Sequence, residues 1–107
     1  MRSDIEAIVD ELRASGERYR ETIRVAAMSA GVYVLPAGGT DPQSPHEEDE
    51  VYYVVRGRGR FLSGDSDRAA TGGAMLFVPA RQEHRFHAIE EELVLWVVFA
   101  PAESSRG

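Results

Sequence analysis

The chain opens with a segment whose apolar residues recur at helical spacing, and then changes to short segments with a strand-like pattern. A helix is expected over Ser3–Ala14 with Ser3 as its N-cap, because Glu6 follows at the capping-box position. Ser15–Gly16 is expected to end the helix. We interpret this helix as a clasp over one end of the fold or as a dimer contact. Its apolar stripe consists of Ile5, Ile8, Val9 and Leu12.

The rest of the chain alternates short apolar segments with turn residues, a pattern typical of a sandwich or barrel. The sequence therefore predicts an all-β fold, an antiparallel β-barrel or jelly roll. Ser29–Gly31, Gly57–Gly59 and Glu90–Glu92 are each expected to interrupt the sheet, with Gly57–Gly59 forming a tight hairpin. The expected strands are Thr22–Met28, Val32–Leu35, Val51–Arg56, Arg60–Ser63, Arg68–Thr71, Ala74–Val78, Phe86–Ile89 and Leu93–Phe99.

Two of these strands are apolar on both faces. Leu93–Phe99 carries no polar side chain, and neither does Ala74–Val78. A strand with one face in water should alternate instead, so something must cover the second face. We expect that cover to be a second copy of the chain, which predicts a homodimer. The alternative is that the N-terminal helix supplies the cover alone.

Composition limits the chemistry that is open to the chain. Its 107 residues are expected to form one barrel domain over 22–101, preceded by helix and linker at 1–21 and followed by a polar tail at 102–107. Cysteine and lysine are absent, which excludes thiolate ligands and lysine Schiff-base chemistry. The net charge of −6 argues against nucleic acid as a partner. No apolar run approaches the length of a membrane span, about 18 residues, and the polar first residues do not resemble a leader, so a cytoplasmic location is expected.

The histidines and one glutamate are the candidate metal ligands. His46 and Glu50 have the same parity, so both can face one side of an extended segment. A third ligand from a later strand, His84, would complete a set of two imidazoles and one carboxylate, which leaves metal positions open. Phe86 shares the face of His84, whereas His87 lies on the opposite face and is expected at the surface or at an interface.

Two segments carry a resemblance to a known family. His46-x3-Glu50-x6-Gly57 resembles the first cupin motif, and Gly73-x5-Pro79-x4-His84 resembles the second. The region between the motifs is short, as in small bacterial cupins. The resemblance covers about Val32 to Ala100 and implies a small single-domain cupin of the type 2 conserved-barrel group.

The resemblance implies one divalent transition metal, Zn, Fe, Mn or Ni, held by His46, Glu50 and His84. The chain also departs from the family pattern. Ser44 stands where the family has its first histidine, and neighbouring Gln43 would point to the other face. Arg81 and Ala88 replace the inner glycine and the asparagine of the second motif. A three-ligand site remains, with lower expected affinity.

Other residues are candidates for the cavity around this site. Tyr52 shares the parity of Glu50 and is expected to line the cavity. Arg60 is a candidate contact for an anionic substrate, and Glu48 is expected in a solvated acidic rim from which it could reach a metal. The full set of expected pocket or substrate contacts is Ser44, Gln43, Tyr52, Arg60, Phe86 and Trp96.

Two functional classes stay open at this stage. One is a metal-dependent enzyme, of oxygenase or isomerase type, that acts on a small polar organic molecule. The other is a non-catalytic module that binds a small ligand or a metal in a partly degenerate site. A purely structural dimeric scaffold is a third reading. The sequence identifies no catalytic residue.

Overall fold

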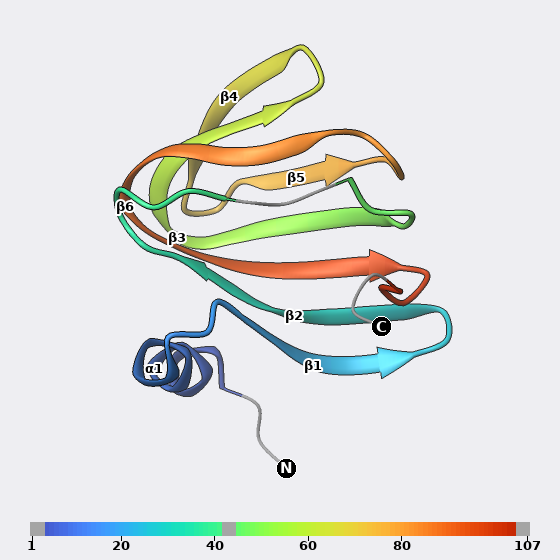
Figure 1. Ribbon diagram of the computed structural model, residues 1–107, viewed down its shortest axis with the longest axis horizontal. Coiled ribbons are helices and arrows are strands. Elements are labelled where there is room, and N and C mark those ends of the chain that lie inside the picture. The colour runs from blue at the N-terminus through green and yellow to red at the C-terminus, as the bar shows by residue number, and fades with distance from the viewer. Residues whose placement is uncertain (1–3, 42–44, 105–107) are drawn as a thin grey trace.

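The computed structural model describes residues 4–41 and 45–104 as one helix and six strands (Figure 1). Every strand pair is antiparallel, and the strands follow the order β1-β2-β6-β3-β4, with β5 paired to β3. The predicted antiparallel all-β fold of jelly-roll type with a short helix is confirmed; over the described residues, the hydrogen-bonded path stays open at β1 and β4. The elements are α1 (Ile5–Ser15), β1 (Tyr19–Val25), β2 (Met28–Leu35), β3 (Asp49–Ser63), β4 (Ser66–Thr71), β5 (Met75–Val78) and β6 (His84–Ala100).

Helix α1 begins one residue later than the capping box predicts. Its N-cap is Asp4, whose carboxylate accepts a hydrogen bond of 3.0 Å from the amide of Glu6. The expectation that Ser3 caps the helix is wrong, and Ser3 lies outside the described residues. Gly16 ends the helix as predicted, in a left-handed conformation with φ +78°.

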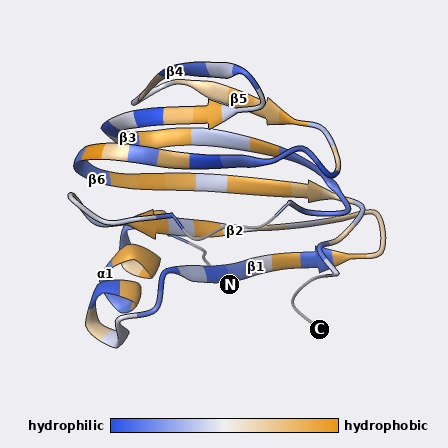
Figure 2. Ribbon diagram, turned by 45° about the horizontal axis from the view of Figure 1, so that its top comes forward, coloured by the Kyte–Doolittle hydropathy of each residue, from blue (hydrophilic) through white to orange (hydrophobic). Residues whose placement is uncertain are grey.

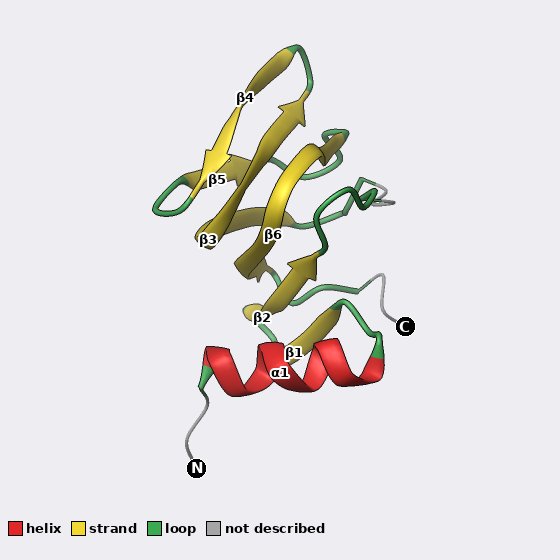
Figure 3. Ribbon diagram, turned by 90° about the vertical axis from the view of Figure 1, so that its left-hand side faces the viewer, coloured by secondary structure: helices red, strands yellow, loops and turns green. Residues whose placement is uncertain are grey.

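Helix α1 packs across one end of the sheet, against β1 and β2 (Figure 3). Its residues Val9 and Leu12 are fully buried and join a small cluster on the outer face of the sheet. The sheet contributes Val32, Val34 and Val94 to this cluster. The helix therefore lies over one end of the sheet, where the clasp interpretation places it. Within residues 4–41 and 45–104, no helix has the length and hydropathy of a membrane span.

Two of the predicted interruptions are absent, because β3 and β6 are long continuous strands. Gly57–Gly59 lies inside β3 and Glu90–Glu92 lies inside β6. Gly57 does have a positive φ of +108°, but it serves a β-bulge and not a hairpin. The register of β3 against β6 shifts between Val54 and Arg60, so the buried positions change parity. Strands β3 and β6 pair with each other both before and after this irregular stretch.

The predicted interruption at Ser29–Gly31 is also wrong. These residues lie within β2, and the turn from β1 is made by residues 26–27. Gly31 is required by close approach rather than by a turn, since a Cβ there would lie 2.5 Å from the ring of Tyr19. Strand β1 begins at Tyr19, inside the segment expected to be linker.

The sheet separates a main core from an apolar outer face. Strand β6 is apolar over most of its C-terminal half, and β5 is similar (Figure 2). Helix α1 covers only part of the outer face, where Trp96 packs against the helix cluster. The rest stays exposed, including Phe77 at 62% and Met75 at 72%. The main core is built from residues of β2 to β6, among them Leu35, Tyr52, Val54, Phe61, Phe86, Leu93, Leu95 and Val97.

Candidate metal centre

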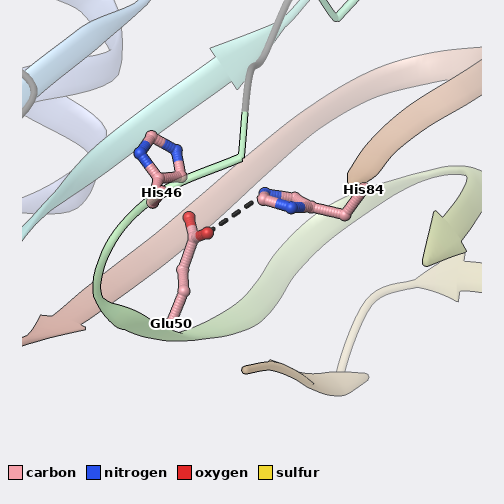
Figure 4. Close-up of side chains that lie close together, drawn as sticks. All are labelled: His46, Glu50 and His84. Atoms are coloured by element: carbon pink, nitrogen blue, oxygen red, sulfur yellow. Dashed lines mark ion pairs between the residues drawn. The ribbon is translucent and has the colours of Figure 1, made fainter. Parts of the chain in front are cut away.

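Three side chains converge inside the barrel from three parts of the chain. Glu50 lies on β3, His84 begins β6, and His46 lies in the loop before β3. One ligand atom from each residue lies within 4.8 Å of the others. Both imidazoles lie around the carboxylate end of Glu50, His46 above it and His84 beside it in the view of Figure 4. The structure therefore brings together all three residues of the predicted ligand set.

The carboxylate of Glu50 is the most deeply buried charge of the cluster. Glu50 is 1% exposed, and neither of its oxygens accepts a hydrogen bond of normal geometry from the described residues. Its Oε1 lies 3.1 Å from Nε2 of His84. Burying a carboxylate in this way is costly unless a positive charge lies beside it. The surroundings of Glu50 thus favour a cation at the centre of the cluster.

His84 is oriented with one ring nitrogen toward this centre. Its Nδ1 lies 2.9 Å from the carbonyl oxygen of Gln82, which can only accept, so Nδ1 carries the proton in the neutral ring. Its Nε2 faces Glu50 and lies 3.2 Å from the hydroxyl of Tyr52. Burial lowers the pKa of His84, but the adjacent carboxylate of Glu50 and the hydrogen bond to the carbonyl oxygen of Gln82 raise it, and the pKa lies above the usual 6.5. Positive charge is favoured here as well.

His46 is held on the other side of the cluster. Its side chain is 12% exposed, and its ring packs edge-on against Phe99 with centroids 5.0 Å apart. Nδ1 of His46 lies 3.4 Å from a carboxylate oxygen of Glu103, a residue that follows β6. Sequence reasoning missed Glu103, because the polar tail in which it lies carries no periodic signal.

A cavity of about 190 Å³ lies beside the cluster and is lined by two of its residues, His46 and Glu50. Tyr33, which also lines the cavity, donates a 2.7 Å hydrogen bond to the buried carboxylate of Asp41. Burial and the neighbouring Asp41 raise the pKa of Tyr33, so its hydroxyl stays protonated as a donor. The cavity is mainly aromatic with a few convergent polar groups, as small-molecule sites are. Its lining residues are Tyr19, Tyr33, His46, Glu50, Tyr52, Val97, Phe99 and Glu103.

The other predicted pocket residues fall in different places. Tyr52 lines the cavity as expected, and Phe86 is buried in the core behind it with ring centroids 5.0 Å apart. Trp96 requires correction, because it lies on the outer face against the helix cluster. Arg60 also requires correction, because it is exposed and bonds to Asp67 outside the cavity.

The acidic segment before β3 is not a uniform solvated rim. Glu48 is 3% exposed, which corrects the expectation for this residue. Its Oε2 accepts hydrogen bonds from the backbone and the hydroxyl of Ser104. Gln43 and Ser44, two of the expected contacts, lie outside the described residues.

His87 lies apart from the cluster, as strand alternation predicts. Its Nε2 is 3.1 Å from the carboxylate of Asp67, and both side chains are partly exposed. The hydrogen bond from His87 lowers the pKa of Asp67. This pair belongs to the surface of β4 and β6, so His87 is a natural control for the buried histidines.

An antiparallel barrel-like sheet with two histidines and a glutamate gathered inside defines a small β-barrel protein with a candidate metal centre. The sequence model of the cupin domain family matches residues 31–100, so the chain belongs to the cupin family. An uncharacterized protein of Streptomyces coelicolor is 44% identical over 94 residues, which cover 88% of this chain and 90% of that protein.

Solved structures share the fold. KdgF from a Halomonas species matches with a TM-score of 0.75 and 19% identity, over 83% of this chain and 82% of that one. The DMSP lyase DddQ from Ruegeria pomeroyi matches with a TM-score of 0.71 and 20% identity. That match covers 94% of this chain but only 65% of the lyase. Identities this low show the fold alone.

Proposed function

We propose that this chain is a metal-binding cupin that holds one divalent transition metal through His46, Glu50 and His84. The carrying observation is the buried carboxylate of Glu50, which lacks a normal hydrogen bond and lies between two imidazoles. Imidazole and carboxylate ligands without thiolates suit Zn, Fe, Mn or Ni. The identity of the metal is part of what the experiment must determine.

The small cavity supports a role with a small polar organic molecule as ligand or substrate. A bound metal would supply Lewis-acid or redox chemistry at its open positions. Around it, Tyr52 and Tyr33 line the space with hydroxyl groups that can orient a polar ligand, and Phe99 limits access of water. We favour a metal-dependent enzyme of oxygenase or isomerase type. A module that binds without turnover is the alternative, since no described side chain in the cavity is set apart as a general base.

We also propose that two copies of the chain associate through the outer face of the sheet. Phe77 and Met75 protrude from this face, and an apolar groove lies beside them between α1 and the sheet. A two-fold interface needs such a self-complementary pair of features, so that the protruding residues of each copy enter the groove of the other. The groove is lined by Ile5, Ile8, Thr22, Ile23, Tyr53, Val55 and Trp96.

The metal proposal is tested by metal content. Untagged protein purified without chelators is analysed by elemental mass spectrometry, beside the variants His84→Ala and His87→Ala. We expect about one metal per chain in the parent and in His87→Ala, and loss of the metal in His84→Ala. Both variants remove one imidazole, but only His84 faces Glu50.

Two outcomes would count against the proposal. Equal loss of metal in both variants would remove the assignment of His84. No metal in the parent, even after reconstitution with iron, zinc, manganese and nickel, would indicate a vestigial site and favour a scaffold or a metal-free binding role.

A further inference from the structure

The residues that follow β6 are held by hydrogen bonds to other parts of the barrel. We call Ala102–Ser104 the C-terminal strap; it lies beside the hairpin of β1 and β2 (Figure 1). The amide of Glu103 donates to the hydroxyl of buried Ser29 at 2.8 Å, and Arg24 donates to the carbonyl oxygen of Glu103 at 2.6 Å. On the other side, Ser104 donates twice to Glu48. Residues 102–104 of the polar tail are thus anchored to two separate parts of the barrel.

This anchoring places a second buried carboxylate at the cavity. Glu103 is 7% exposed and lines the same cavity as Glu50 and Tyr52. Its Oε2 lies 3.4 Å from Nδ1 of His46. A buried carboxylate needs a positively charged or hydrogen-bonding partner, and the imidazole of His46 provides one. The burial of Glu103 and the orientation of His46 therefore depend on each other.

The two histidines of the site are held by the same scheme. Nδ1 of His84 is fixed by the carbonyl oxygen of Gln82, and Nδ1 of His46 is fixed by Glu103. Nε2 of His84 faces Glu50, and the contact of Nδ1 with Glu103 assigns Nε2 of His46 to the same role. A carboxylate that accepts the outer N–H of a metal-bound histidine fixes its tautomer and makes the other nitrogen a stronger ligand. Moreover, the carboxylates of Glu50 and Glu103 together balance the charge of a divalent cation.

We infer that Glu103 is a positioning residue of the metal centre, which acts on the metal through His46. This inference rests on the proposed metal site. It assigns to the C-terminal strap the function of presenting one carboxylate to a metal-binding histidine. The strap is far from both motifs in the sequence, so the metal centre depends on a segment outside the residues that the family model matches.

The test compares metal affinity in variants of the full chain. Affinities for Zn²⁺ and Co²⁺ are measured by competition with a chromophoric chelator, and the visible absorption spectrum of bound Co²⁺ reports the ligand geometry. Glu103→Ala is expected to weaken binding by about 10- to 100-fold and to shift the Co²⁺ spectrum. Glu103→Gln keeps an acceptor for the N–H of His46, so it should restore the parent spectrum and part of the affinity.

Ser104→Ala is the matched control, because it removes a strap hydrogen bond to Glu48 but leaves the carboxylate of Glu103. It should bind metal within about threefold of the parent. Equal weakening in Ser104→Ala and Glu103→Ala would overturn the inference, since Glu103 would then only anchor the strap. Unchanged affinity and spectrum in Glu103→Ala would overturn it too.

Two further measurements separate this inference from the proposed function. If the parent binds metal and His84→Ala does not, an unaffected Glu103→Ala removes only the role of Glu103. If the parent binds neither Zn²⁺ nor Co²⁺, both the proposed function and this inference fail. Long-range ¹H–¹⁵N NMR of the Zn²⁺-bound parent, which needs no variant, should show His46 coordinated through Nε2 with the proton on Nδ1. The opposite tautomer would overturn the inference.

Discussion

At the scale of single residues, Gly57 determines how β3 passes through its irregular stretch. Its φ of +108° is open to glycine but strained for other residues, and the added Cβ would collide with the backbone carbonyl of Glu92 on β6. Both constraints come from a bulge in the pairing of two long strands. The glycine is thus needed for the approach of β3 to β6.

Replacing Gly57 by alanine should therefore cost more than replacing another glycine of positive φ. We expect Gly57→Ala to lower the free energy of unfolding by about 3 kcal/mol or more, from backbone strain plus collision. Gly73→Ala is the control, because Gly73 has φ +95° but open space around its Cβ, and should cost about 1–2 kcal/mol. Urea denaturation followed by circular dichroism measures both. Equal losses would show that the collision is relieved cheaply.

The bulge at Gly57 also explains which site residues could be predicted from the sequence. Glu50 and Tyr52 precede the bulge, so simple alternation placed them on the inner face correctly. Arg60 follows it, and the change of parity directs Phe61 inward instead, which alternation alone could not show. For Trp96, the strand is apolar on both faces, so its pattern does not reveal which face is inner. Glu103 gave no signal, because a polar tail shows no periodicity.

At the scale of elements, glycine and charged residues were misleading as interruptions. The fold class followed from the many short apolar segments, but their number was overestimated where one strand continues through a glycine or through Glu90–Glu92. In β6, these glutamates are largely exposed, and two of them pair with Arg58 on β3. Local polarity therefore marks the surface of a continuous strand as readily as it marks a turn.

The attachment of α1 to the sheet offers a prediction at the same scale. Arg13 on the helix donates from Nε to Glu92 on β6 at 3.1 Å, and a second guanidinium nitrogen pairs with the same carboxylate. The hydrogen bond from Arg13 lowers the pKa of Glu92 below the usual 4.5. A carboxylate whose pKa is lowered by folding stabilises the fold above its unfolded pKa, and this stabilisation is lost as the pH falls through the folded value.

We therefore expect Glu92→Gln to be less stable than the parent at pH 7, by about 1 kcal/mol or less, because the pair is partly solvated. The difference should shrink at acidic pH, because the parent carboxylate also becomes neutral as the pH falls through the lowered folded pKa of Glu92. Denaturant unfolding at the two pH values measures it. A difference of the same size at both would mean that the loss comes from packing and not from charge. Glu90→Gln, which changes the same charge on an exposed residue of β6 that pairs with Arg58, is the control.

At the scale of the whole molecule, the sheet has more apolar surface than one chain covers. The inner face forms the core and the cavity, and α1 shields only the end of the outer face around Val94 and Trp96. The strands that are apolar on both faces were recognisable from the sequence, because apolar and polar residues do not alternate along them. The sequence left open whether the helix or a second copy covers the outer face. The structure shows how much of this face the helix covers. The helix accounts for part of the face and leaves a patch formed by Ile23, Val25, Val51, Tyr53, Met75 and Phe77, each at least 40% exposed.

Exposed apolar patches of this kind mark interaction surfaces, and a flat sheet face can pack on a copy of itself. If two chains associate here, the parent should have a mass in solution of about twice 11.8 kDa by light scattering at tens of micromolar. Phe77→Glu places two like charges in the shared interface and should yield the monomer with its fold intact by circular dichroism. Ser66→Glu adds the same charge at the exposed start of β4 and should leave the dimer unchanged. A parent that is monomeric, or a Phe77→Glu variant that stays dimeric, would mean that this patch serves another partner or that the dimer forms elsewhere.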